Sequence, residues 1–151
     1  MTHLFNLYRT AKLAIFAVTL TLASGLANAQ SPQCTVLRGA YAFTASGSAV
    51  FPGNSAPVPL NAVGVIKFDA DGTFTNVVSQ NFNGFVQRFA PGTGTYTLKP
   101  DCSGTITQVF LDGSIHISDF VVSKRGKTIY AVGVGDHGPR NMLALTATRI
   151  D

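Results

Sequence analysis

The feature that most constrains the fold is a succession of short β-branched and aromatic runs, separated by Gly, Asp-Gly or Pro at intervals of about 8–12 residues. Almost no part of residues 35–151 shows helical periodicity. The pattern predicts strands at 37–45, 60–69, 73–80, 85–89, 94–99, 105–110, 114–122, 127–134 and 141–149. The chain is therefore expected to form an all-β domain of eight or nine strands.

The connections between these runs are typical of hairpins. "ADG" at 70–72, "DG" at 112–113 and "RG" at 125–126 supply the glycine that tight turns with positive φ require. Sequential hairpins make neighbouring strands antiparallel, and the resulting meander can stay open, fold into a sandwich or close into a barrel. Only closure removes the exposed edges. We predict an antiparallel, eight- to nine-stranded up-and-down barrel.

Closure of about eight strands leaves an interior that is either filled by side chains or holds one small ligand. The segment at 46–61 is rich in turn-forming residues and has no regular apolar period. It is expected to form a loop or lid over one mouth of the barrel, or an ordered crossing.

The first 29 residues have the features of a secretory signal. Arg9 and Lys12 come before an apolar run, "LAIFAVTLTLASGLA". The run leads into the small-x-small cleavage pattern Ala27-Asn28-Ala29. A membrane anchor is the alternative, but it needs about 20 apolar residues, and small and polar residues interrupt this run. We expect cleavage after Ala29, a single domain at 30–151 without a membrane span, and a periplasmic or secreted location.

Export gives the two cysteines, Cys34 and Cys102, an oxidising compartment. Only one intrachain pairing is open to them, and the chain-entropy treatment gives it about 4 kcal/mol of stabilisation. The alternative is a free nucleophilic or metal-binding thiol, which would need a histidine or second ligand nearby in sequence, and neither cysteine has one. We predict a Cys34–Cys102 disulfide that ties the N-terminal end of the domain to its middle.

The charge of the chain does not indicate a nucleic-acid partner. Loss of Arg9 and Lys12 with the signal lowers the formal net charge from +4 to +2. The remaining basic residues are scattered except in "KRGK" at 124–127, which is typical of a hairpin turn. No nucleic-acid partner is predicted, and the oligomeric state is left open.

Two short motifs resemble functional signatures but lack their context. "GVGDHG" at 133–138 has the spacing G-x-G-x-x-G, yet Pro139 and another strand follow where a dinucleotide site needs a helix. "DADGT" at 69–73 resembles the start of a calcium loop, but the chain has no glutamate to complete one. His116 and His137 are too few for a self-contained zinc site, and no G-x-S-x-G elbow marks a serine hydrolase. No metal, cofactor or catalytic residue is predicted.

Four segments of the chain resemble one protein family. They are "CTVLRGAYAFTASG" near the start of the expected domain, "IKFDADGTF", "GTYTLKPDCSGT" and the terminal "ATR". In these segments the chain resembles small exported bacterial proteins with an allene-oxide-cyclase-like, calycin-type β-barrel, most of them without an assigned activity. The resemblance implies an antiparallel eight-stranded barrel with an apolar cavity, similar in shape to the plant allene oxide cyclases and dirigent proteins. It implies architecture alone, because a fold is shared more widely than a function.

Polar residues on the expected strands are the candidates for holding a ligand in such a cavity. They are Tyr41, Arg88, Tyr96, His116, Asp119, Tyr130 and Arg149. We select Arg88, Tyr130 and Arg149 first because each interrupts an otherwise plausible strand, with Tyr96 and His116 as further candidates. The alternative places the tyrosine hydroxyls at the barrel rim and the arginines on the outside, paired with aspartates.

Three functions are compatible with these features. The favoured one is an exported barrel that binds a small apolar or aromatic molecule in its interior, because the sequence contains no catalytic cluster. The second is a cyclase or isomerase that confines an apolar substrate in a reactive conformation, since such proximity catalysis needs no recognisable triad. The third is an envelope protein with a filled barrel and protein partners. A cavity would favour the first two, and a filled interior would favour the third.

Overall fold

The computed structural model describes residues 34, 36–51, 55–110, 113–123, 125–137 and 140–151, without the side chains of 136–141. The expected signal at 1–29 lies outside the described residues, as do the side chains of Asp136 and His137 and the whole of Gly138 in the glycine-rich motif. Within the described part of the chain, no helix has the length and apolar character needed to cross a membrane.

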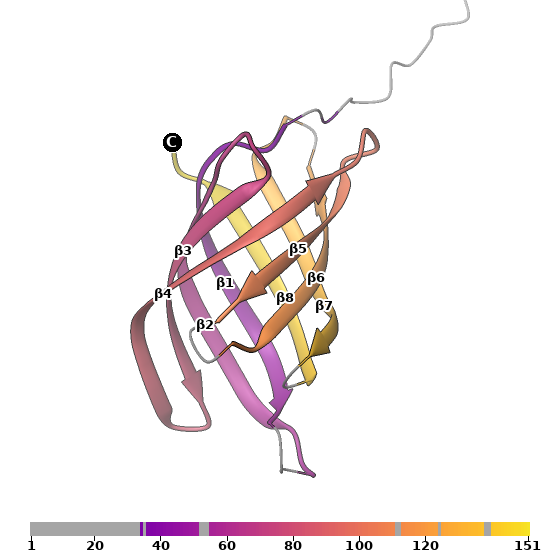
Figure 1. Ribbon diagram of the computed structural model, residues 1–151. Coiled ribbons are helices and arrows are strands. Elements are labelled where there is room, and N and C mark those ends of the chain that lie inside the picture. Colours follow the sequence, from indigo (N-terminus) through magenta and orange to yellow (C-terminus); the bar gives the residue numbers. More distant parts are fainter. Residues whose placement is uncertain (1–33, 35, 52–54, 111–112, 124, 138–139) are drawn as a thin grey trace, which may run out of the picture.

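The described residues form eight strands arranged as a closed barrel. They are β1 (Gly39–Val50), β2 (Val58–Phe68), β3 (Thr73–Phe82), β4 (Phe85–Leu98), β5 (Ser103–Val109), β6 (Ile115–Val122), β7 (Thr128–His137) and β8 (Arg140–Arg149). Each strand pairs antiparallel with the next, and β8 pairs with β1 to close the sheet (Figure 1). The predicted all-β, antiparallel up-and-down barrel is confirmed, and closure gives every strand a neighbour on both sides.

The prediction of separate strands at 85–89 and 94–99 is wrong. Both belong to β4, so the described chain forms eight strands and not nine. The strand continues through Pro91, which is paired in register with Val77 of β3. The ladder is interrupted instead by a bulge just before Ala90, where Phe89 has a φ of +48°.

The bounds of the loop, lid or ordered crossing expected at 46–61 are too wide. The first strand continues to Val50 and the second begins at Val58, so most of this segment belongs to the barrel wall. Pro59 is the second residue of β2, near the strand end where proline is tolerated, and its carbonyl accepts a hydrogen bond from Asn83 N–H at 3.1 Å. Inward-facing Leu60 is 3% exposed.

The end of the barrel where β1 begins is filled by aromatic side chains, and we call it the packed end. Tyr41 and Phe68 are almost fully buried. Phe68 makes edge-to-face contacts with Tyr41 and Tyr96 at centroid distances of 5.6 and 5.2 Å. The Tyr96 hydroxyl lies 2.6 Å from the carbonyl oxygen of Leu37 and 2.8 Å from that of Asp69, so its single proton always has an acceptor.

The predicted disulfide between Cys34 and Cys102 is present at the packed end. Beside it, Cys34 N–H donates to the Pro100 carbonyl at 3.3 Å. The side chain of Leu37, three residues further on, is 2% exposed. The segment that leads into β1 therefore covers this end of the barrel (Figure 1).

Three cross-strand pairs place a phenylalanine ring over a glycine on the inner side of the barrel. The pairs are Phe43 with Gly64, Phe74 with Gly94, and Phe120 with Gly104. A Cβ built on each glycine would lie 2.5–2.9 Å from the nearest atom of the partner ring. Glycine therefore makes room for each ring, and the ring covers backbone that glycine would leave bare.

Candidate functional site

The half of the barrel opposite the packed end is hollow. An outer chamber of about 300 Å³ lies where β3 and β5 end and β4 and β6 begin. An inner chamber of about 80 Å³ lies deeper in the barrel. The two chambers share six lining residues: Val78, Gln80, Gln108, Phe110, His116 and Leu143. The two chambers therefore adjoin, with these six side chains bordering both.

Strand alternation makes the cavity walls mainly apolar. On β8, Leu143 and Leu145 face inward, while Met142, which precedes Leu143, is 57% exposed. On β7, Ile129 and Ala131 line the inner chamber, while Tyr130 between them is exposed. Phe51 and Phe82 stand at the outer chamber and contact one another edge to face at a centroid distance of 5.2 Å.

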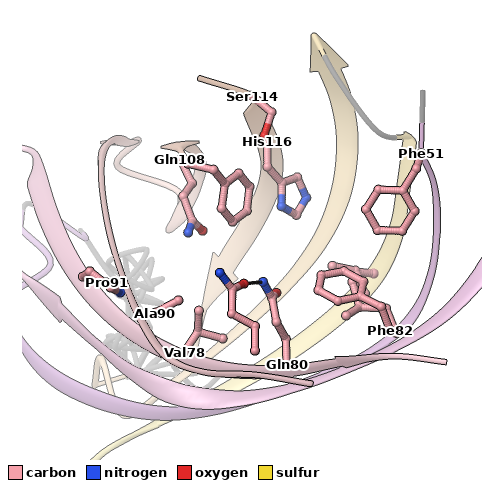
Figure 2. A pocket seen from close by; sticks show the side chains of 13 residues that line it. Phe51, Val78, Gln80, Phe82, Ala90, Pro91, Gln108, Ser114 and His116 are labelled. Atoms are coloured by element: carbon pink, nitrogen blue, oxygen red, sulfur yellow. Dashed lines mark hydrogen bonds between the residues drawn. The ribbon is translucent and has the colours of Figure 1, made fainter. Parts of the chain in front are cut away.

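Side-chain amides supply most of the polar groups in the outer chamber. Gln80 Nε2 donates to Gln87 Oε1 at 2.5 Å across β3 and β4. Figure 2 shows Gln80 on one side of the pocket, with Gln108 and His116 on the other. No Asp, Glu, Lys or Arg is found among the described residues that line either chamber.

The imidazole of His116 lies between the two chambers and has defined neighbours. Its ring is stacked on Phe110 with an interplanar angle of 10° and a centroid distance of 6.5 Å. Its Nε2 is 3.3 Å from Ser118 Oγ, and the direction of this hydrogen bond depends on the tautomer. Asp119, three residues away from His116, lies on the outer face and accepts a hydrogen bond from Thr105 at 2.9 Å. As strand geometry predicts, the imidazole and this carboxylate do not share a site.

Asn76 differs from the other cavity residues because it is deeply buried and one of its polar atoms has no hydrogen bond. It lines the inner chamber and is 7% exposed. Its side-chain oxygen Oδ1 is buried and has no hydrogen-bond partner. Sequence reasoning did not select this residue, although Phe74, Asn76 and Val78 share one face of the predicted strand at 73–80. A polar residue between two apolar neighbours on that face was the available signal.

The five sequence-selected candidates are not brought together. His116 lines both chambers. Tyr96 lies at the packed end, where burial raises the pKa of its phenol. Tyr130 is 53% exposed on the outer face of β7, and Arg88 is exposed on the β3–β4 hairpin. Neither chamber is lined by any of the other four candidates, Tyr96, Tyr130, Arg88 and Arg149.

Arg149 instead forms an ion pair at the packed end of the barrel. Its Nε donates to Asp151 Oδ1 at 2.8 Å, and this hydrogen bond raises the pKa of the guanidinium. The other carboxylate oxygen of Asp151 accepts from Ala40 N–H at 2.9 Å. That backbone hydrogen bond and the one from Arg149 lower the pKa of the Asp151 carboxyl. The ion pair therefore ties the C-terminus to the start of β1. Within the described residues, no three His, Cys, Asp or Glu side chains are grouped as metal ligands would be.

Comparison of the chain with models of known protein families, with curated proteins and with solved structures gives no match. The resemblance to the allene-oxide-cyclase-like barrels therefore stays a prediction, based on the four sequence segments. The closed eight-stranded barrel is compatible with it. Fold alone does not assign a function, so the function has to come from the chemistry of the cavity.

Proposed function

We propose that the protein binds a small, mainly apolar molecule inside its barrel. The observation that carries this proposal is the pair of adjoining chambers in the hollow half of the barrel, an outer one of about 300 Å³ and an inner one of about 80 Å³. Ligand pockets begin at about 300 Å³ and are lined mainly by apolar side chains with a few polar groups. The walls have this character, because leucine, phenylalanine and alanine side chains surround a small set of amides and one imidazole.

The hydrophobic effect supplies the driving force for such binding. Each Å² of apolar ligand surface moved from water into the chambers contributes about 25 cal/mol. The polar groups then select the orientation of the ligand, since a buried polar atom that loses water without a new partner costs free energy. The cavity volumes also speak against the interpretation as a protein-interaction module with a filled barrel. We further propose a periplasmic or secreted location, which the Cys34–Cys102 disulfide supports.

Ligand binding can be tested with N-phenyl-1-naphthylamine, an uncharged fluorophore whose emission increases in apolar surroundings. We expect saturable binding with one site per chain. Leu143 lines both chambers, so Leu143→Trp places a bulky ring between them and is expected to weaken binding at least about tenfold.

Met142→Trp is the matched control, because Met142 precedes Leu143 on β8 and is 57% exposed. It adds the same ring to the opposite face and is expected to leave the affinity unchanged. Circular dichroism and melting temperature show whether both variants are folded. Absence of saturable binding by the wild type, or equal binding by both variants, would refute an internal site.

A further inference from the structure

The inner chamber contains a buried polar atom that the rest of the fold does not use. Asn76 Oδ1 has no hydrogen-bond partner, and the residue is 7% exposed. An unpaired buried acceptor has a free-energy cost that folding alone does not recover. Such an atom is expected where a ligand supplies the missing donor.

A second side-chain amide lies close to Asn76. Asn76 on β3 lies directly opposite Gly92 on β4, and Gln108 comes from the next strand, β5. A Cβ on Gly92 would overlap Asn76 Oδ1 and would lie 2.9 Å from Gln108 Nε2. The φ angle of Gly92 is not positive, so the backbone conformation does not require glycine there. The missing Cβ at Gly92 instead leaves room for the Asn76 amide itself, and Gln108 Nε2 lies beside the same position. Both Asn76 and Gln108 line the inner chamber.

From this geometry we propose that Asn76 and Gln108 recognise a neutral hydroxyl group on an apolar ligand. The inference rests on the proposed ligand-binding function and specifies the class of ligand. The hydroxyl donates its proton to Asn76 Oδ1 and accepts a hydrogen bond from Gln108 Nε2. Because Oδ1 has no hydrogen-bond partner, Gln108 Nε2 does not donate to it, and the acceptor is left for the hydroxyl.

Other polar groups match this arrangement less well. A ketone or an ether only accepts hydrogen bonds and would leave Asn76 Oδ1 unpaired. A carboxylate would lose its hydration without gaining a counter-charge, since no Lys or Arg is found among the described residues that line the chambers. It would also face an amide oxygen. An alcohol or phenol with its apolar body in the space shared by the two chambers satisfies both amides and needs no charge.

Four probes of one shape test this inference: 1-naphthol, naphthalene, 1-methoxynaphthalene and 1-naphthoate. For the wild type at neutral pH, calorimetric or competition titrations are expected to show 1-naphthol binding at least about tenfold more tightly than the other three, the contribution of a hydrogen bond to a buried acceptor. This series uses only the wild type, so it tests the hydroxyl preference even if a substitution prevents folding. Equal affinities for 1-naphthol and 1-methoxynaphthalene, or tighter binding of 1-naphthoate, would overturn the inference.

The variant Asn76→Leu assigns the preference to this residue, since leucine has nearly the same size and no acceptor. The variant is expected to bind naphthalene as the wild type does, to lose the preference for 1-naphthol, and to melt no lower than the wild type. Asn61→Leu is the matched control, because Asn61 is exposed on β2, and it is expected to keep the preference.

The outcomes separate this inference from the function on which it rests. If the wild type binds none of the uncharged probes, both the ligand-binding function and the inference fail. If naphthalene binds but Asn76→Leu keeps the hydroxyl preference, the ligand-binding function stands and the inference fails. A clearly lower melting temperature for Asn76→Leu would show that Oδ1 supports the fold through a bound water, and this would also overturn the inference.

Discussion

Loss of the Cys34–Cys102 disulfide is expected to destabilise the domain strongly. The bridge joins residues 68 positions apart, and it fastens the segment before β1 to the turn before β5. For a closed loop of this length the chain-entropy relation gives about 4 kcal/mol at 25 °C. The whole free energy of unfolding of a small domain is about 5–15 kcal/mol. Reduction should therefore remove a large part of the stability.

The folded state without the bridge keeps other contacts of the same segment. Leu37 remains buried, and its carbonyl remains an acceptor for the Tyr96 hydroxyl. We therefore expect the barrel still to form, with the loss coming from the larger conformational freedom of the unfolded chain. The unfolded chain also becomes more expanded, so the dependence of the free energy on urea should become steeper.

Equilibrium urea unfolding, followed by far-ultraviolet circular dichroism, measures this loss. The oxidised protein, the reduced protein and the double variant Cys34→Ala/Cys102→Ala should be compared. The reduced protein and the double variant should agree with each other, and only the wild type should respond to reductant. A loss below about 1 kcal/mol, with mass analysis showing both thiols free, would contradict the entropic account.

Two further predictions concern the glycines and the buried phenols. Gly94→Ala is expected to lower the free energy of unfolding by about 1–3 kcal/mol, because a Cβ there would overlap the carbonyl of the facing strand and lie 2.5 Å from the Phe74 ring. Gly135→Ala is the control for urea unfolding, since its Cβ would make only ordinary contact at 3.8 Å, and an equal loss in both variants would contradict the steric explanation. For Tyr96, burial raises the pKa of the phenol above its ordinary value near 10, so the stability it contributes is present below pH 10 and is lost as the pH rises through the raised pKa. In urea unfolding at a series of pH values, Tyr96→Phe should therefore show a smaller fall in stability above pH 10 than the wild type. Tyr130→Phe, on the exposed face, should follow the wild type. Equal pH profiles for Tyr96→Phe and the wild type would refute this explanation.

The fold could be predicted from the sequence because its signals are local. Asp-Gly and Arg-Gly turns between short β-branched runs indicate hairpins independently of the rest of the sequence. The disulfide followed from a count of two cysteines and the expected compartment. The two errors came from reading prolines as strand breakers. Pro59 lies near a strand end, and Pro91 lies beside a bulge, and both positions tolerate the missing N–H.

The candidate site was harder to predict because it depends on which face of each strand points inward. A shift of one residue in register exchanges the two faces, and only closure of the whole barrel fixes the choice. The strand at 114–122 carried polar residues on both faces, so its sequence did not decide between His116 and Asp119. The candidates were chosen among charged residues, tyrosines and histidine, and no amide side chain was included. Asn76 and Gln108 were thus overlooked, although both line the inner chamber.

The two ends of the barrel differ in what is attached to them. Cys34 and Asp151, where the described chain starts and stops, both lie at the packed end (Figure 1). The outer chamber lies at the other end of the barrel. A tether or fused partner joined near Cys34 or Asp151 would therefore be attached at the end of the barrel away from that chamber.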